Sequence, residues 1–324
     1  MSNIGIFNMA LPPETAPHLK MESGPVQALR EHLMRSLSLR VLNVPQPPKV
    51  GSVSEDEVDT RIAVLFSGGL DCTVLARLAS ELLPLEQGVD LLNVAFENPR
   101  LAARLDPSSD PLAIYEACPD RITGRRSFKE LLTCCPGRRW RFIAVNVPYS
   151  ETQGHRSEIV SLMHPHNTEM DLSIAYALYF AARGAGIGQI DPETPSGCQH
   201  VSTPARVLLS GLGADELLAD TCGMPPPLGV GATKAYSRSS SWTSAGSWAI
   251  EAPAWEKCDF ATTAATTAGE GIELDPEKRV LRLLAAQLGM RNVAGEKKRA
   301  IQFGSRTAKM ESGKIKGTHI ITGP

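Results

Sequence analysis

The chain has 324 residues and a formal net charge of −2, from 33 Lys and Arg against 35 Asp and Glu. At about 150 residues per domain, this length fits one large domain or two smaller ones. A hydrophobic content of 42% excludes a wholly disordered chain, and the near-neutral charge argues against a nucleic-acid binder. No apolar run approaches the ~20 residues of a membrane span, and seven cysteines without a CxxC pair indicate a reducing, cytoplasmic location.

The first 60 residues are predicted to be a leader with one helix. Apolar residues recur every four positions over 25–42, which is the pattern of an amphipathic helix, and prolines follow at 45, 47 and 48. An acidic linker over 52–60 then leads to Arg61, where the main domain is expected to begin.

From residue 61 onward, apolar runs of strand length alternate with helical patterns. The runs lie at 61–66, 90–96, 141–147 and 206–210, and the helical patterns lie at 73–83, 153–163 and 171–183. Strands that alternate with helices predict parallel pairing through right-handed crossovers. The expected fold class is therefore α/β, with a doubly wound parallel sheet over 61–220.

Neither period continues after residue 220. Between 222 and 250, 19 of 29 residues are Gly, Pro, Ala, Ser or Thr, and such a segment cannot bury enough apolar surface to offset its backbone entropy. We therefore expect 221–275 to be irregular and disordered. Helices over 276–316 are expected to complete the domain, with Glu277, Lys278 and Arg282 on the surface. The first of these helices has an apolar stripe of four residues, Val280, Leu281, Leu284 and Leu288.

The strongest chemical signal is the SGGLD loop (Ser67-Gly68-Gly69-Leu70-Asp71), between a predicted strand and a predicted helix. Two glycines permit a tight turn and a close ligand, and N–H groups at a helix N-terminus attract anions. Ser67 can donate a hydrogen bond, and the Asp71 carboxylate can hold Mg²⁺. The loop is neither a Walker sequence nor a dinucleotide fingerprint, because GxxxxGK[ST] and GxGxxG are absent from the sequence.

A second motif, SGLGADE at 210–216, also joins a predicted strand to a predicted helix. Ligands of open α/β sheets gather at the C-terminal ends of the strands, so both motifs are expected to face one crevice. Asp215 is then a second carboxylate for Mg²⁺. The alternative is that Asp215 and Glu216 only complement the helix dipole.

The SGGxD pattern resembles the PP-loop of the ATP pyrophosphatases, which cleave ATP between the α- and β-phosphates. The SGxGxDE pattern is similar to the second signature of asparagine synthetases, which helps to hold Mg²⁺-pyrophosphate. Further stretches, among them LLNVAFEN, RITGR, EKRVLRLLAAQLG and KKRAIQFGSRTAKME, resemble the eukaryotic asparagine synthetase domain-containing family. The resemblance covers about 61–220 and 253–312, and a fungal member is expected.

This resemblance implies an ATP-dependent, amide-forming ligase of the glutamine amidotransferase family. Aspartate is activated as a β-aspartyl-adenylate, and ammonia, derived from glutamine in complete members, then releases AMP and leaves asparagine. The implied cofactors are ATP and Mg²⁺, with Asp71 and Asp215 at the metal and Asp215, Lys298 and Arg299 in catalysis. The partners are small molecules, without nucleic acid or a membrane. The residues implied to bind the nucleotide are Ser67, Gly68, Gly69, Leu70, Asp71, Val94, Ser210, Gly211 and Gly213.

Three features depart from the family pattern. Ser2 stands where the glutaminase nucleophile is a Cys, and there is no room for that domain before Arg61, so 1–60 are expected to be a remnant of the connection to it. Leu212 stands where asparagine synthetases carry Glu. The sequence after residue 216 lacks the family's Gly-Tyr and Arg-His elements. If residues 220–247 are read one frame over, with free choice of synonymous codons, these elements reappear. We therefore interpret this part as a frame-shifted gene model, with a genuine low-complexity insertion as the alternative.

Two other functions stay open. The fold could serve as a catalytically inactive nucleotide-binding or interaction module, which Leu212 and the altered 220–272 region favour. A tRNA-modifying PP-loop enzyme is the third possibility, and the lack of CxxC and of a separate basic RNA-binding domain counts against it. Formation of asparagine from aspartate, ATP and ammonia separates the first function from the others.

Overall fold

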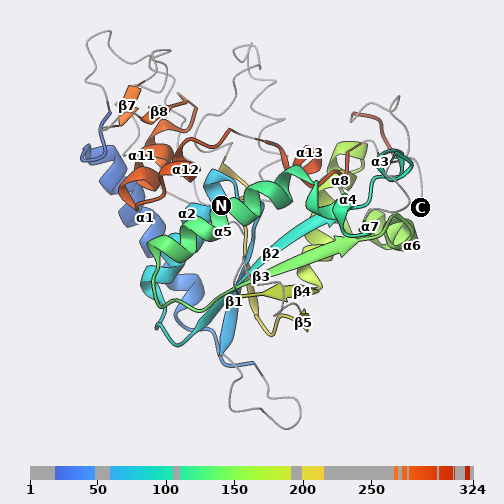
Figure 1. Cartoon of the computed structure of the whole chain (residues 1–324), viewed down its shortest axis with the longest axis horizontal. Coiled ribbons are helices and arrows are strands. Elements are labelled where there is room, and N and C mark those ends of the chain that lie inside the picture. The colour runs from blue at the N-terminus through green and yellow to red at the C-terminus, as the bar shows by residue number, and fades with distance from the viewer. Residues whose placement is uncertain are drawn as a thin grey trace.

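The computed structural model describes ten stretches of the chain, which are 19–47, 59–104, 110–190, 199–214, 266–268, 272–275, 277–297, 299–308, 310 and 318–321. They form an α/β fold around one mixed sheet (Figure 1). None of the helices in these stretches combines the length and the apolar character that crossing a membrane requires.

Six strands form the sheet in the order β5-β4-β3-β2-β1-β6. Strands β6, β1, β2 and β3 run parallel, as the alternating pattern predicted, and helical segments connect β1 to β2 and β2 to β3. Strand β4 is antiparallel to both β3 and β5. Their bounds are β1 (Thr60–Leu65), β2 (Gly88–Phe96), β3 (Trp140–Val147), β4 (Ala185–Gln189), β5 (Gln199–Ser202) and β6 (Val207–Leu209).

The prediction of an entirely parallel sheet is therefore wrong at the β4–β5 edge. Strand β4 carries Gly186 and Gly188 instead of a continuous apolar run, so its sequence gave no strand signal. The structure shows why glycines occupy these positions. A Cβ at Gly186 would lie 2.5 Å from the carbonyl oxygen of Ala144, and a Cβ at Gly188 would lie 2.7 Å from Val201.

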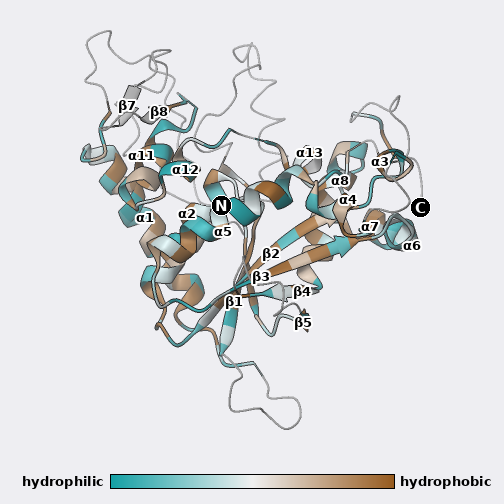
Figure 2. Ribbon diagram, viewed as in Figure 1, coloured by the Kyte–Doolittle hydropathy of each residue, from teal (hydrophilic) through white to brown (hydrophobic). Residues whose placement is uncertain are grey.

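Helices cover both faces of the sheet, and alternate residues of β1 divide between them. Ile62 and Val64 join an apolar cluster with helices α1, α2, α5, α11 and α12, whereas Ala63 and Leu65 join a second cluster with α7 and α8. Figure 2 shows apolar residues along the central strands between these layers. The bounds are α1 (Gly24–Val41), α2 (Leu70–Leu82), α5 (Pro119–Cys134), α7 (Arg156–Leu162), α8 (Glu169–Ala182), α11 (Arg279–Gln287) and α12 (Arg291–Ala294).

Four short helices and a hairpin complete the described elements. The hairpin lies within the stretch 221–275, most of which, together with the proposed frame shift, lies outside the described residues. The elements are α3 (Pro99–Ala102), α4 (Ala113–Glu116), α6 (Tyr149–Gly154), α13 (Ile301–Gly304), β7 (Thr266–Ala268) and β8 (Ile272–Leu274).

Helix α11 carries the apolar stripe that the sequence predicted. The four residues of the stripe are buried, and α11 contacts α1, α2 and α12. The prediction of surface positions is wrong for Lys278, which is 6% exposed, and for Arg282, which is 1% exposed. Lys278 contacts Asp71, 207 residues away, and Arg282 contacts backbone carbonyls 12 and 14 residues further along the chain.

Candidate functional site

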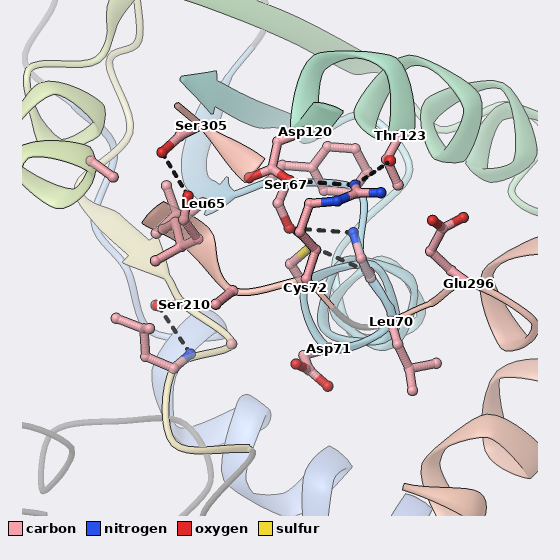
Figure 3. A pocket seen from close by; sticks show the side chains of 18 of the residues that line it. Leu65, Ser67, Leu70, Asp71, Cys72, Asp120, Thr123, Ser210, Glu296 and Ser305 are labelled. Carbon is pink, nitrogen blue, oxygen red and sulfur yellow. Dashed lines mark hydrogen bonds and ion pairs between the residues drawn. The ribbon is translucent and has the colours of Figure 1, made fainter. Parts of the chain in front are cut away.

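The two predicted loops lie together at one end of the sheet. Strands β1 and β6 are parallel neighbours, so the SGGLD loop and the SGLG loop (210–213) follow adjacent strand ends. A Cβ at Gly211 would lie 2.9 Å from the Cβ of Asp71, which shows how closely the loops approach. Both loops line one cavity of about 330 Å³ (Figure 3). The expected crevice at the C-terminal strand ends is therefore present.

The SGGLD loop is fixed from behind by helix α5. Gly68 has φ +82°, and a Cβ there would lie 2.5 Å from the Cα of Gly124, so only glycine fits. Ser127 Oγ donates a hydrogen bond to the Gly68 carbonyl at 2.6 Å. Asn93 Nδ2 donates to the Phe66 carbonyl at 2.8 Å. The loop conformation is thus determined by contacts with α5 and β2.

The N-terminus of α2 opens onto the cavity. Its N-cap is Gly69, which provides no side-chain cap for the first-turn N–H groups. Such a helix end attracts an anion through its backbone donors and dipole. Cys72, also in this turn, is buried, and burial raises the pKa of its thiol, so it is no thiolate nucleophile at neutral pH.

Asp71 forms an ion pair that closes one wall of the cavity. Lys278 Nζ donates to Asp71 Oδ1 at 2.9 Å and to Oδ2 at 2.8 Å. Lys278 immediately precedes α11 with a left-handed backbone (φ 55°), and its side chain is 4% exposed. The pair joins the SGGLD loop to the C-terminal helices over a separation of 207 residues.

Arg299 approaches the same cavity from a segment that follows α12. Its Nη1 donates to Thr123 Oγ1 at 3.3 Å and lies 4.0 Å from Asp120 Oδ1. Burial raises the pKa of Asp120 to about 7, although the Arg299 charge acts in the opposite direction. Asp120 and Thr123 both belong to α5, so this helix supports the SGGLD loop and also forms a second wall of the cavity.

Two further contacts hold the segment that carries Arg299. Arg282 donates through Nη1 to the carbonyls of Ala294 and Glu296 at 2.7 and 2.8 Å. The Glu296 carboxylate accepts from Arg126 of α5. Arg282 therefore holds the backbone of the segment that leads to Arg299, and this role requires its side chain to be buried.

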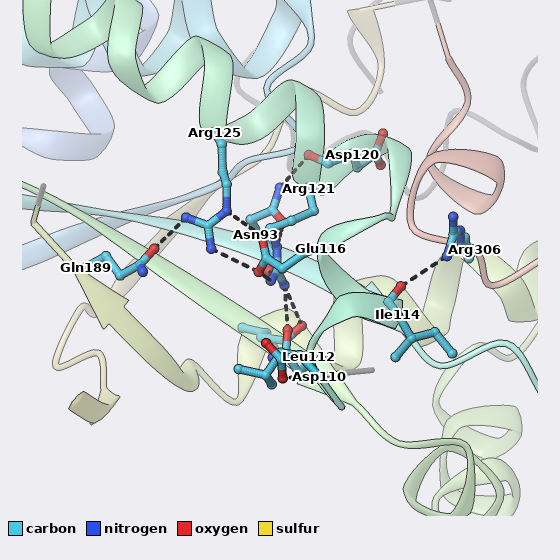
Figure 4. Close-up of polar contacts among 12 residues, drawn as sticks. Asn93, Asp110, Leu112, Ile114, Glu116, Asp120, Arg121, Arg125, Gln189 and Arg306 are labelled. Atoms are coloured by element: carbon cyan, nitrogen blue, oxygen red, sulfur yellow. Dashed lines mark hydrogen bonds and ion pairs between the residues drawn. The ribbon is translucent and has the colours of Figure 1, made fainter. Parts of the chain in front are cut away.

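A polar network beneath α5 orients the supports of the SGGLD loop (Figure 4). Arg121 is fully buried and donates to Asn93 Oδ1 at 2.6 Å and to Glu116 Oε1 at 2.8 Å. Burial tends to raise the pKa of Glu116, but hydrogen bonds and charge from Arg125 and Arg121 lower it overall. Arg125 also donates to Gln189 Oε1 at 2.5 Å, which ties the β4 edge to the network.

Most of the residues implied by the family resemblance lie together, and residues outside that set join them. Gly68 belongs to the SGGLD loop and packs on α5, whereas Asp215 and Lys298 lie outside the described residues. The implied residues that line the cavity are Ser67, Gly69, Leu70, Asp71, Val94, Ser210, Gly211, Gly213 and Arg299. Further lining residues include Asp120, Thr123, Lys278, Arg282 and Glu296. Asp120, Thr123, Lys278 and Arg282 lie in or next to RITGR and EKRVLR, two stretches that carried the family resemblance. Their position in these stretches was the sequence signal that could have identified them as site residues.

Comparison with known proteins defines the class of this chain. No protein-family model matches it. Asparagine synthetase domain-containing protein 1 of Bos taurus is 32% identical over 88% of this chain and 52% of its own length. The Mus musculus protein of the same name is 33% identical over 79% of the chain and 47% of its own length.

An asparagine synthetase domain-containing protein of Saccharomyces cerevisiae is 35% identical over 80% of this chain and 50% of its own length. Over the matched region, the chain therefore belongs to the asparagine synthetase domain-containing family, as its motifs indicated. It spans about half the length of the curated relatives it matches.

Proposed function

We propose that the cavity binds Mg-ATP and that the chain is an amide-forming ligase of the asparagine synthetase type. The observation that carries the proposal is the convergence of the SGGLD and SGLG loops on one cavity. Backbone donors at the start of α2, with Lys278 on the wall, suit a polyphosphate. Membership of the asparagine synthetase domain-containing family supports the same function. The PP-loop ATP pyrophosphatase type of α/β fold is part of this proposal.

The residues of the cavity fit both parts of Mg-ATP. Carboxylate oxygens are preferred ligands of Mg²⁺, and the Asp71 side chain is 26% exposed, so a metal can reach it. Lys278 occupies both Asp71 oxygens here, so Mg²⁺ would share or replace that ion pair. Asp215 is proposed as a further ligand. Bound Mg²⁺ would neutralise phosphate charge.

The proposed reaction has two steps. An oxygen of the aspartate β-carboxylate attacks the α-phosphorus of ATP, the α–β phosphoanhydride bond breaks, and pyrophosphate leaves. Ammonia then attacks the acyl carbon of the adenylate, the bond to the AMP oxygen breaks, and the nitrogen loses a proton to give asparagine. Lys298 would stabilise the charge that develops on the departing pyrophosphate, and Asp215 and Arg299 would act beside it in catalysis. A cytoplasmic location and glutamine-derived ammonia belong to the same proposal.

The first test is calorimetric titration of Mg-ATP into the purified chain and two variants. Asp71→Ala is expected to weaken Mg-ATP binding at least tenfold, about 1.4 kcal/mol. Asp59→Ala is the matched control, because Asp59 precedes β1 at the opposite end of the strand. An unchanged affinity in Asp71→Ala would exclude the SGGLD loop from the nucleotide site.

The second test measures chemistry. Aspartate-dependent exchange of labelled pyrophosphate into ATP reports adenylate formation, and asparagine and AMP report the complete reaction with ammonium as the nitrogen source. We expect Mg-ATP binding to be better preserved than adenylate formation, because the chain departs from the family pattern after residue 216.

A nucleotide-binding module without catalysis is the second candidate function. The Lys278 ion pair on Asp71 and Leu212 in the second loop favour it. Mg-ATP binding without any aspartate-dependent exchange would identify this module.

A further inference from the structure

Three carboxylates line the cavity among the described residues, and their partners differ. Asp71 is hydrogen-bonded through both oxygens to Lys278, and Glu296 accepts a hydrogen bond from Arg126. Asp120 is different, because the cation paired with it within the described chain, Arg299, lies 4.0 Å away. That separation is beyond hydrogen-bond length.

Asp120 is nevertheless deeply buried. The residue is 5% exposed, and a methyl group at Gly304 would overlap its carboxylate, so the backbone of α13 packs directly against it. Removing a carboxylate from water without a hydrogen-bonding partner is costly. The raised pKa of Asp120 reflects this cost. The fold therefore keeps an unfavourable acidic group at the wall of a cavity.

Arg299 presents the complementary group beside Asp120. Its guanidinium donates to Thr123 and remains 36% exposed at the cavity wall. Guanidinium groups bind carboxylates through paired donors in a planar fork. Asp120 and Arg299 together offer an acceptor for an ammonium and a donor for a carboxylate, a few ångströms apart.

We propose that Asp120 and Arg299 form a recognition site for the zwitterionic end of an α-amino acid. The ligand's ammonium bonds to Asp120, and its α-carboxylate bonds to Arg299. The inference rests on the proposed function, since it names the residues of the same cavity that select the amino-acid substrate. The ammonium supplies the hydrogen-bonded cation that Asp120 does not have among the described residues. An acidic side chain on the ligand would then be directed to the SGGLD and SGLG loops.

The test compares two probes that differ by one group. L-aspartate carries the ammonium and succinate does not, and each is titrated calorimetrically into the full chain saturated with Mg²⁺ and a non-hydrolysable ATP analogue. The wild-type chain is expected to bind L-aspartate at least tenfold more tightly than succinate. Asp120→Asn is expected to lose this preference and to keep its affinity for the ATP analogue. Asp110→Asn, which alters an exposed carboxylate outside the cavity, is the matched control.

A second variant tests the other half of the site. Arg299→Met is expected to weaken L-aspartate and succinate to the same extent, because both probes keep a carboxylate at this position. Equal affinities of the wild type for the two probes, an unchanged preference in Asp120→Asn, or no binding of either probe would each overturn the assignment. The affinity for the ATP analogue is measured separately, without amino acid. If the analogue does not bind, the proposed nucleotide function is contradicted, and this outcome is distinct from a failure of the amino-acid site.

Discussion

The two walls of the cavity differ in how closely a cation approaches their carboxylates. On the wall formed by the SGGLD loop, Asp71 has a buried lysine within 2.9 Å of both oxygens. On the α5 wall, Asp120 is more deeply buried than Asp71 but stands 4.0 Å from its nearest paired cation. Within the described residues, one carboxylate has a hydrogen-bonded cation and the other has a cation beyond hydrogen-bond length. This difference supports the proposal that Asp120, unlike Asp71, receives its hydrogen-bonded cation from a ligand.

The largest expected effect comes from disrupting the contact between the two walls. Gly68→Ala places a Cβ against the backbone of Gly124 in a left-handed conformation, and we expect a loss of about 4 kcal/mol of unfolding free energy. Urea denaturation measures this loss, and calorimetry should show no Mg-ATP binding. Gly137→Ala is the matched control, because Gly137 has φ +81° with open space around it, so only about 1 kcal/mol of strain is expected. Equal losses in the two variants would contradict the steric contact.

Next in size is the removal of the charge on the α5 wall. The folded pKa of Asp120 is raised from 3.8 to about 7, so the folded state holds the proton more tightly than the unfolded state. The stability that this proton contributes is full below pH 3.8 and is lost as pH rises to about 7. Asp120→Asn cannot ionise, so at pH 8 it should be more stable than the wild type by up to about 4 kcal/mol.

Urea denaturation of Asp120→Asn at pH 4, 6 and 8 checks this expectation. The gain should grow across the series and stop growing above pH 7. A variant that is less stable than the wild type at pH 8 would show that the Asp120 carboxylate is well satisfied, which would remove the contrast between the walls.

Breaking the ion pair on the other wall should have a smaller effect. Lys278→Met removes the two hydrogen bonds that Lys278 donates to Asp71, and Asp71→Asn removes the charge that faces the buried Lys278. A double-mutant cycle with both changes is expected to give a coupling free energy of about 2 kcal/mol. Chemical denaturation of the four proteins measures it. A coupling near zero would mean that the ion pair does not fasten α11 to the SGGLD loop.

The smallest effect is expected far from the cavity, at Asp59. The hydrogen bond from Arg61 lowers the pKa of Asp59, so its contribution to stability is present above pH 3.8 and is lost as pH falls below that value. Asp59→Asn should therefore cost less than about 1 kcal/mol at pH 7, and the cost should disappear in acid. This pH dependence is opposite in sign to that of Asp120. The same denaturation measurements, extended below pH 3.8, check it, and a matching sign would contradict the assigned causes.

Much of the framework could be predicted from local sequence. The SGGLD loop follows an apolar run and precedes a helical pattern, and those two local signals place it at a strand end. The stripe of α11 follows from periodicity alone, because one apolar face of a helix must be covered by its neighbours. The same reasoning did not identify strand β4, because its glycines are required by close contacts with β3 and β5 and not by a local pattern.

The charged groups of the cavity show where local sequence stops being sufficient. By itself, the sequence determined the two loops, the strands that carry them and the apolar face of α11. Only the tertiary structure decided that Lys278 is buried on Asp71 and that Arg299, the cation paired with Asp120 in the described part of the chain, lies beyond hydrogen-bond length. The physical reason is that the cost of burying a charge depends on its partner, and here the partners are 207 and 179 residues apart in the chain.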